Sequence, residues 1–147
     1  MKYRFATLAD IPILAGMNLR LTEDENHRNR FKPEQWFKNR MEQFIDNDYK
    51  AVLFEKEGKI VAYALYRNHP DHDDTIYLRQ IFVERESRRE GIGREVMIIL
   101  KTNIWPNEKR LTVEVLSHNE VARKFFQSVG YKEYCIELEI KPEERNL

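Results

Sequence analysis

The chain has little of what marks secreted, membrane-spanning or nucleic-acid-binding proteins. It has one cysteine, Cys135, which excludes an internal disulfide and any thiolate metal cage. Lys plus Arg and Asp plus Glu both number 25, so no overall positive charge favours nucleic acid. The apolar stretch at 11–19 is shorter than the roughly 18 residues of a membrane span and lacks the features of a signal peptide. We therefore expect a cytoplasmic protein with no nucleic-acid or membrane partner.

The length of the chain predicts one domain over residues 1–147, since it suits a single core. Apolar residues repeat at helical spacing after Pro12 and after Pro33, and two strand-like runs flank Gly58 as in a β-hairpin. We expect an α/β (α+β) fold with a central mixed sheet. The predicted order is strand 2–6, helices from 12 and 33, hairpin 50–68, strand 75–84, helix 91–103, strand 110–116, helix 118–130 and strand 131–140.

Glycine is scarce, with five in the chain, yet Gly91 and Gly93 lie one residue apart in "SRREGIGREVM" (87–97). A glycine turn before a helix exposes backbone N–H groups at the positive end of the helix dipole and favours a phosphate. The dinucleotide fingerprint would need a glycine where Val96 stands, and the P-loop ending Gly-Lys-Ser/Thr is missing. An isolated pair of glycines could also serve only a tight turn.

The stretch resembles the acetyl-CoA-binding motif of the GCN5-related N-acetyltransferases, Gln/Arg-x-x-Gly-x-Gly/Ala, through Arg88, Gly91 and Gly93. A second family motif follows in the correct order, with matches at Asn119, Ala122, Phe125, Gly130 and Tyr131. The resemblance covers residues 75–135 specifically, and the predicted order of elements fits the family over nearly the whole chain. It implies an enzyme that transfers an acetyl group from acetyl-CoA to a primary amine of a small molecule, peptide or protein.

The resemblance also implies a fold and a cofactor site. The fold is a twisted six- or seven-stranded sheet flanked by about four helices and splayed between its fourth and fifth strands. Acetyl-CoA would lie in that gap, with no metal. Its pantetheine would meet the strand at Ile81, Phe82 and Val83, and its pyrophosphate the turn Arg88, Arg89, Glu90, Gly91, Ile92, Gly93 and Arg94. Asn119, Ala122, Phe125 and Phe126 would line the opposite side.

The catalytic residues depart from the family pattern. Attack on a thioester needs a neutral amine, whereas a lysine-like amine has a pKa of ~10.4, so a base is useful. Glu114 resembles in position the glutamate base of some relatives, with a water near Tyr77 as the alternative; it could equally be a charged residue on a half-exposed strand. The resemblance assigns the oxyanion donor to a backbone N–H near Ile81. The usual tyrosine acid is replaced by Phe126, which leaves Tyr131, Tyr134 or water.

The acceptor is less well defined by the sequence. Glu23, Asp24 and Glu25 could attract a cationic amine, whereas Arg79, with Arg20, could hold a carboxylate or phosphate; each could also be a solvated surface charge. The loop "HPDHDD" (69–74) lacks a recognised metal-ligand spacing, so no metal is expected. A catalytically quiet acyl-CoA-binding module is the alternative function. The final strand offers an edge for a possible homodimer.

Overall fold

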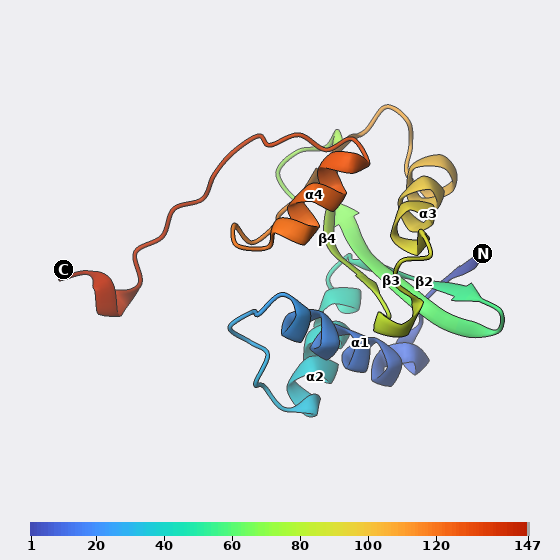
Figure 1. Ribbon diagram of the computed structural model, residues 1–147, viewed down its shortest axis with the longest axis horizontal. Coiled ribbons are helices and arrows are strands. Elements are labelled where there is room, and N and C mark those ends of the chain that lie inside the picture. Colours follow the sequence, from blue (N-terminus) through green and yellow to red (C-terminus); the bar gives the residue numbers. More distant parts are fainter. Residues whose placement is uncertain (147) are drawn as a thin grey trace.

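The computed structural model describes residues 1–146, in which a five-stranded sheet separates two helical layers (Figure 1). Helices α1 and α2 lie on one side of the sheet and α3 and α4 on the other. The strands follow the order β1-β2-β3-β4-β5; neighbours are antiparallel except for the parallel pair β4 and β5. The elements are β1 (Lys2–Phe5), α1 (Ile11–Asp24), α2 (Glu34–Asp46), β2 (Lys50–Lys56), β3 (Lys59–Asn68), β4 (Thr75–Val83), α3 (Ile92–Ile99), β5 (Arg110–Val113) and α4 (Glu120–Ser128).

Alternation along the central strands produces two cores. On β2, Leu53 faces α1 and α2, whereas its neighbours Val52 and Phe54 face α3 and α4. Leu14 and Met41 close the first core from the helices, and all five side chains are fully buried. Because successive strand residues point to opposite faces, a strand buried on both sides must be apolar throughout. The sheet is therefore the rigid element on which the site is built.

The β2–β3 hairpin forms where the sequence predicts it. Glu57 and Gly58 both have positive φ, at 52° and 79°, in a two-residue loop between Lys56 and Lys59. This geometry matches the twist of the flanking strands and fixes their register.

Strand β4 contains one residue more than its partner. Leu65 pairs with Gln80 and Tyr66 pairs with Leu78, so Arg79 has no opposite residue on β3. Such a β-bulge shifts the alternation of side chains by one position. As a result Arg79 and Gln80, although consecutive, both contact residues on the α1 and α2 side of the sheet.

The predicted final strand is wrong, because residues 131–140 are extended but pair with no strand in the described chain. The sheet consequently has five strands rather than six or seven. The segment leaves the body after Gly130, whose φ is 110°, and runs outward (Figure 1). Its side chains Tyr134, Ile136, Leu138 and Ile140 are 76–88% exposed. Cys135, on the same segment, is exposed as well.

Candidate active site

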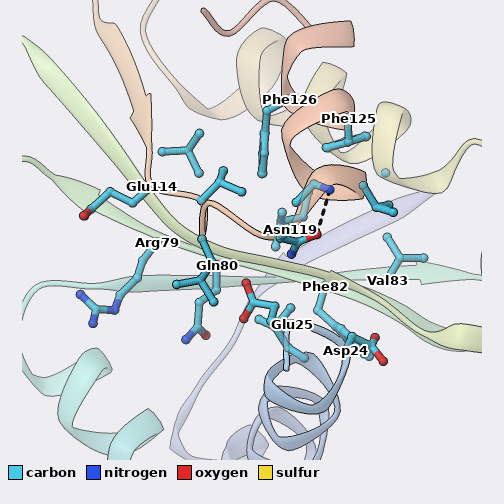
Figure 2. Close-up of a pocket in the computed structure, with 18 of the residues that line it drawn as sticks. Asp24, Glu25, Arg79, Gln80, Phe82, Val83, Glu114, Asn119, Phe125 and Phe126 are labelled. Atoms are coloured by element: carbon cyan, nitrogen blue, oxygen red, sulfur yellow. Dashed lines mark hydrogen bonds between the residues drawn. The ribbon is translucent and has the colours of Figure 1, made fainter. Parts of the chain in front are cut away.

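A cavity of about 940 Å³ opens where β4 and β5 diverge (Figure 2). The two strands are paired only from Thr75 to Leu78 on β4, so over residues 1–146 the stretch from Arg79 to Val83 has β3 on one edge and no strand on the other. The second half of β4 therefore presents an unpaired edge to the cavity. The predicted splaying between the fourth and fifth strands is confirmed.

The turn before α3 forms one end of the cavity. Arg89 and Gly91 adopt left-handed φ values of 67° and 76°, and α3 begins at Ile92. The first N–H groups of a helix have no partner within the helix, and they lie at its positive end. Six of the seven predicted phosphate-turn residues line the cavity; Glu90 does not, and its carboxylate lies 3.9 Å from Lys56 Nζ. The lining residues of the turn are Arg88, Arg89, Gly91, Ile92, Gly93 and Arg94.

Gly93 contributes to packing between helices. A Cβ placed there would lie 3.1 and 3.2 Å from two carbons of the Phe125 ring. Phe125 comes from α4 and also lines the cavity, so the absence of a side chain at Gly93 lets α3 and α4 meet closely beside it. Gly91 differs, since an added Cβ would meet nothing within 4 Å and only its left-handed φ resists substitution.

Helix α4 supplies the wall of the cavity opposite β4. Asn119 caps this helix, because its side chain accepts a hydrogen bond of 3.1 Å from the N–H of Ala122. Asn119, Ala122, Phe125 and Phe126 all line the cavity. Phe126 is otherwise buried against the sheet, and Tyr131 packs edge-on against its ring at 5.5 Å. Ile81, Phe82 and Val83 on β4 also line the cavity; Ile81 and Val83 pack against the α3 and α4 core, whereas Phe82 belongs to the core on the α1 and α2 side.

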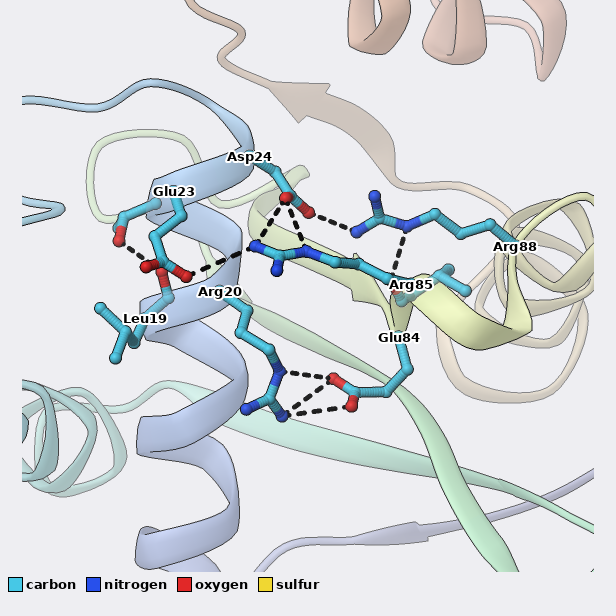
Figure 3. Close-up of polar contacts among 9 residues, drawn as sticks. Leu19, Arg20, Glu23, Asp24, Glu84, Arg85 and Arg88 are labelled. Carbon is cyan, nitrogen blue, oxygen red and sulfur yellow. Dashed lines mark hydrogen bonds and ion pairs between the residues drawn. The ribbon is translucent and has the colours of Figure 1, made fainter.

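An arginine cluster joins the end of α1 to the end of β4 (Figure 3). Arg88 donates to the carbonyl of Val83 at 2.9 Å and to Asp24, which also accepts from Arg85 at 3.0 Å. Glu23 lies 3.4 Å from Arg85 and is not among the residues that line the cavity. The charges of Glu23 and Asp24 are thus directed to arginines, and only Asp24 borders the cavity. This pair is expected to attract the acceptor amine, but both carboxylates are already paired with arginines.

Tyr77 and Glu114 meet at the far end of the cavity. The Tyr77 hydroxyl donates to Glu114 Oε1 at 2.7 Å. Burial, followed by the hydrogen bond to the carboxylate, raises the pKa of Tyr77 well above its usual value, so the hydroxyl stays protonated. Figure 2 shows Glu114 and Arg79 together at one end of β4, with Val83 at the other.

Glu25 is a carboxylate of the cavity for which the sequence motifs predict no catalytic role. It follows the last residue of α1, and its carboxylate points into the cavity (Figure 2). Burial raises the pKa of Glu25, and the neighbouring Asp24 adds to the shift. A carboxyl group with a raised pKa in a cavity is a candidate acid or base. Its only sequence signal is its position beside Glu23 and Asp24.

A buried polar chain orients one further side chain. Asn18 donates to the Tyr63 hydroxyl at 3.2 Å, and that hydroxyl donates to Gln80 Oε1 at 2.8 Å. Because the amide oxygen is the acceptor, the Gln80 amide nitrogen is a donor at the cavity wall with no side-chain partner among residues 1–146. This network joins α1 to β4 through the core, and no local sequence pattern indicates it.

Among residues 1–146, no three His, Cys, Asp or Glu side chains are placed to hold a metal ion. No helix of the described chain has the length and hydropathy that crossing a membrane would require.

Residues 19–141 match the family model described as an acetyltransferase (GNAT) domain. The chain belongs to the GNAT acetyltransferase family. A UPF0039 protein of Schizosaccharomyces pombe is 34% identical over 82 residues, which cover 55% of this chain and 53% of the relative. A probable spermine N(1)-acetyltransferase of Bacillus subtilis subsp. natto is 23% identical over 91 residues, covering 57% of this chain and 60% of the relative. The matches thus span little more than half of these curated relatives.

The fold is shared with solved GNAT structures. A protein of Clostridium acetobutylicum described as a predicted acetyltransferase, determined with acetyl-CoA, superposes with a TM-score of 0.74 at 17% identity, and the match covers 99% of both chains. The family and the fold inferred from the two motifs are therefore confirmed, apart from the number of strands.

Proposed function

We propose that the chain is an acetyl-CoA-dependent N-acetyltransferase that modifies a primary amine of a small molecule, peptide or protein by direct attack. One observation carries the proposal: a single cavity runs from the N-terminal turn of α3, along the unpaired edge of β4, to Tyr77 and Glu114. Phosphate-binding geometry at one end and groups able to accept a proton at the other are what this reaction needs.

The residues present suit acetyl-CoA. The left-handed Gly91 turns the chain so that α3 begins with free N–H groups at the cavity, and Arg88, Arg89 and Arg94 surround them. These groups would hold the pyrophosphate. The unpaired edge of β4 from Ile81 to Val83 would hydrogen-bond pantetheine, and Asn119, Ala122, Phe125 and Phe126 would flank it. Bound acetyl-CoA supplies an activated acetyl thioester.

Groups of the chain would accept the proton of the attacking amine and stabilise the negative charge that develops on the acetyl oxygen. Glu114 would accept a proton from the amine, directly or through a water, with Tyr77 orienting its carboxylate. The Ile81 backbone N–H would stabilise the acetyl oxygen as it becomes negative. Phe126 cannot protonate the departing thiolate, so the proton would come from water or from the amine. Glu25 is the second candidate base because its pKa is raised and it faces the cavity.

Thiol release from acetyl-CoA with a panel of amines tests the activity, and Glu114→Gln and Glu25→Gln separate the two bases. Loss of a general base reduces turnover about 10²- to 10⁴-fold and removes the corresponding limb of the pH profile. Glu42→Gln, an exposed carboxylate on α2, is the matched control. If both Glu114→Gln and Glu25→Gln kept the wild-type rate and pH profile, neither residue would be the base.

The alternative is a catalytically quiet acyl-CoA-binding module, which Phe126 favours because it occupies the usual acid position. Acetyl-CoA should raise the midpoint of thermal unfolding under both proposals. Turnover with any amine supports the enzyme, whereas binding without turnover across a broad panel supports the module. A cytoplasmic location and the absence of nucleic-acid partners stay predictions from composition.

A homodimer is proposed on the exposed segment 131–140. Its side chains alternate so that Tyr134, Ile136, Leu138 and Ile140 share one face, and the outer edge of β5 is unpaired in the described chain. A strand from a second copy would complete the sheet and bury that face. Light scattering should give a dimer for the wild type and a monomer for Ile136→Glu. A wild-type monomer at micromolar concentrations would refute the pairing.

A further inference from the structure

Two arginines that line the cavity away from the turn before α3 have no carboxylate partner among residues 1–146. Arg40 comes from α2 and Arg79 from the bulge of β4, and both line the cavity. Within residues 1–146 neither lies within 4.0 Å of an acidic oxygen, whereas Arg20, Arg85 and other arginines are ion-paired. Figure 2 shows Arg79 extending from β4 toward α2. The two guanidinium groups are thus the unneutralised positive charge at this end of the cavity.

Aromatic rings hold both arginines in place. The Arg79 and Arg40 guanidinium carbons lie 4.8 and 5.0 Å from the centre of the Phe44 ring. Arg40 also stacks on Trp36 at 5.1 Å, and Arg79 donates to the Tyr49 hydroxyl at 3.2 Å. Stacking leaves the N–H edges of a guanidinium available, and an arginine fixed in this way is suited to a planar or tetrahedral anion.

The arrangement costs free energy unless an anion relieves it. The buried Nε of Arg40 has no hydrogen-bond partner in the described chain. Burial lowers the pKa of Arg40, and the charge of Arg79 lowers it further. The pKa of His27, another residue of the cavity wall, is lowered by burial and then by Arg40. The lowered pKa of His27 favours its neutral form, so Arg40 and Arg79 are the two positive charges that share this region, and a bound anion would stabilise both.

We infer that Arg40 and Arg79 form a subsite for a carboxylate or phosphate group carried by the acceptor, so that the preferred acceptor has both a primary amine and an anionic group. The inference rests on the proposed acetyltransferase function and names its substrate class. The carboxylates of Glu25 and Glu114 line the same cavity and would receive the amine, while the arginines receive the anion. The phosphate-binding turn before α3 is at the other end of β4, so it does not compete for the acceptor's anion.

The subsite disfavours polycations. The relative from Bacillus subtilis subsp. natto is described as a probable spermine acetyltransferase. Spermine would place positive charge beside two unpaired guanidinium groups, so this chain should use it poorly.

The test compares acceptors that differ only in the anionic group: β-alanine with its amide, and O-phosphoethanolamine with ethanolamine, with spermine as the polycation. At saturating acetyl-CoA, kcat/KM should be about 10- to 100-fold higher for the anionic member of a pair, chiefly through KM. The amino group of the β-alanine amide is less basic than that of β-alanine, so more of the amide is in the reactive neutral form. A preference for β-alanine therefore cannot arise from amine protonation. The pair with the larger ratio distinguishes carboxylate from phosphate. Equal rates within both pairs would overturn the subsite and leave the acetyltransferase function standing.

A binding measurement makes the test independent of turnover. Calorimetry with CoA-saturated protein should detect O-phosphoethanolamine or β-alanine and should not detect ethanolamine. Arg40→Gln and Arg79→Lys should each weaken that binding about 10-fold or more. Glutamine removes the charge, whereas lysine keeps the charge but loses the planar, bidentate donor geometry of the guanidinium. Arg67→Gln is the matched control, because Arg67 stacks on Tyr49 at 5.2 Å but lies 4.0 Å from Asp48 and outside the cavity.

The outcomes separate the two proposals. No binding of either anionic amine by the CoA complex overturns the subsite, whatever the turnover. Anion-dependent binding without acetyl transfer to any amine supports the subsite and overturns the enzyme. If Arg40→Gln fails to fold, the wild-type pairs and Arg79→Lys still decide the matter.

Discussion

Gly91 and Gly93 should respond to alanine for different reasons, and only Gly93 should depend on Phe125. An alanine Cβ at Gly93 would lie 3.1 and 3.2 Å from the Phe125 ring, closer than ordinary contact. Overpacking of this kind costs about 1–3 kcal/mol, while replacing a helical glycine by alanine gains ~1 kcal/mol. We expect Gly93→Ala to reduce the free energy of unfolding by about 1 kcal/mol. With Phe125→Ala the contact is gone, and Gly93→Ala should then stabilise by ~0.5–1 kcal/mol.

Urea unfolding of the wild type, the two single variants and the double variant measures this coupling, which should be about 1–2 kcal/mol. Gly91→Ala is the control. Its left-handed φ of 76° costs ~1–2 kcal/mol for a non-glycine residue, and nothing lies within 4 Å of the added Cβ. Its effect should therefore be the same with and without the Phe125 ring. If Gly93→Ala and Phe125→Ala were additive within ~0.5 kcal/mol, the packing role assigned to Gly93 would be refuted.

Three further variants test single groups. A bidentate hydrogen bond from Arg4, together with the hydrogen bond from the Thr7 N–H, lowers the Asp10 pKa from 3.8 to about 2. The ionised carboxylate therefore stabilises the fold above pH ~4, and this stabilisation is lost as the pH falls through ~2. Because Arg4 is exposed, Asp10→Asn should cost about 1–2 kcal/mol at pH 7 and almost nothing near pH 2, as measured by urea unfolding. Because the pKa of Glu25 is raised, its protonated form favours folding, and this advantage is lost as the pH rises above the usual pKa of 4.5. Glu25→Gln should therefore raise the midpoint of thermal unfolding at pH 7. An unchanged midpoint would contradict the burial of Glu25. Tyr131 has a buried hydroxyl without a partner in the described chain, so Tyr131→Phe should gain ~1 kcal/mol, and unchanged turnover would exclude it as the acid.

Local patterns in the sequence predict most of the fold correctly. The repeats at Leu14 and Met17, the Glu57-Gly58 turn and the Asn119 cap each depend on residues within a few positions of one another. Such features are set by helix spacing, by backbone sterics and by capping, all of which can be read along the chain. The resemblance to the acetyltransferases adds a proposed cofactor wall, and the residues proposed to bind the cofactor line one cavity apart from Glu90.

The remaining features depend on contacts between distant segments. The sequence interpretation links Gly93 to a phosphate, but its neighbour is Phe125, 32 residues further along the chain. The alternation of "YKEYCIELEI" is typical of a strand, yet a strand also needs an edge to pair with, and alternation carries no information on whether that edge belongs to the same chain. Residues 131–140 have the pattern and lack the partner in the described chain.

The bulge at Arg79 explains why the acceptor end of the cavity is the hardest part to predict. Strict alternation from Tyr77 would place Arg79 on the same face and Gln80 on the opposite one. Because Arg79 has no opposite residue on β3, Gln80 instead reaches Tyr63, and both side chains reach the α1 and α2 side. One extra residue therefore adds the Gln80 amide to the face on which the Arg79 guanidinium packs against Phe44. Residues after the bulge also change face, which leaves Ile81 against the α3 and α4 core and Phe82 against the other. A register set by one unpaired residue determines which side chains lie at the proposed acceptor end of the cavity, whereas the glycine motif determines only where the cofactor would be held.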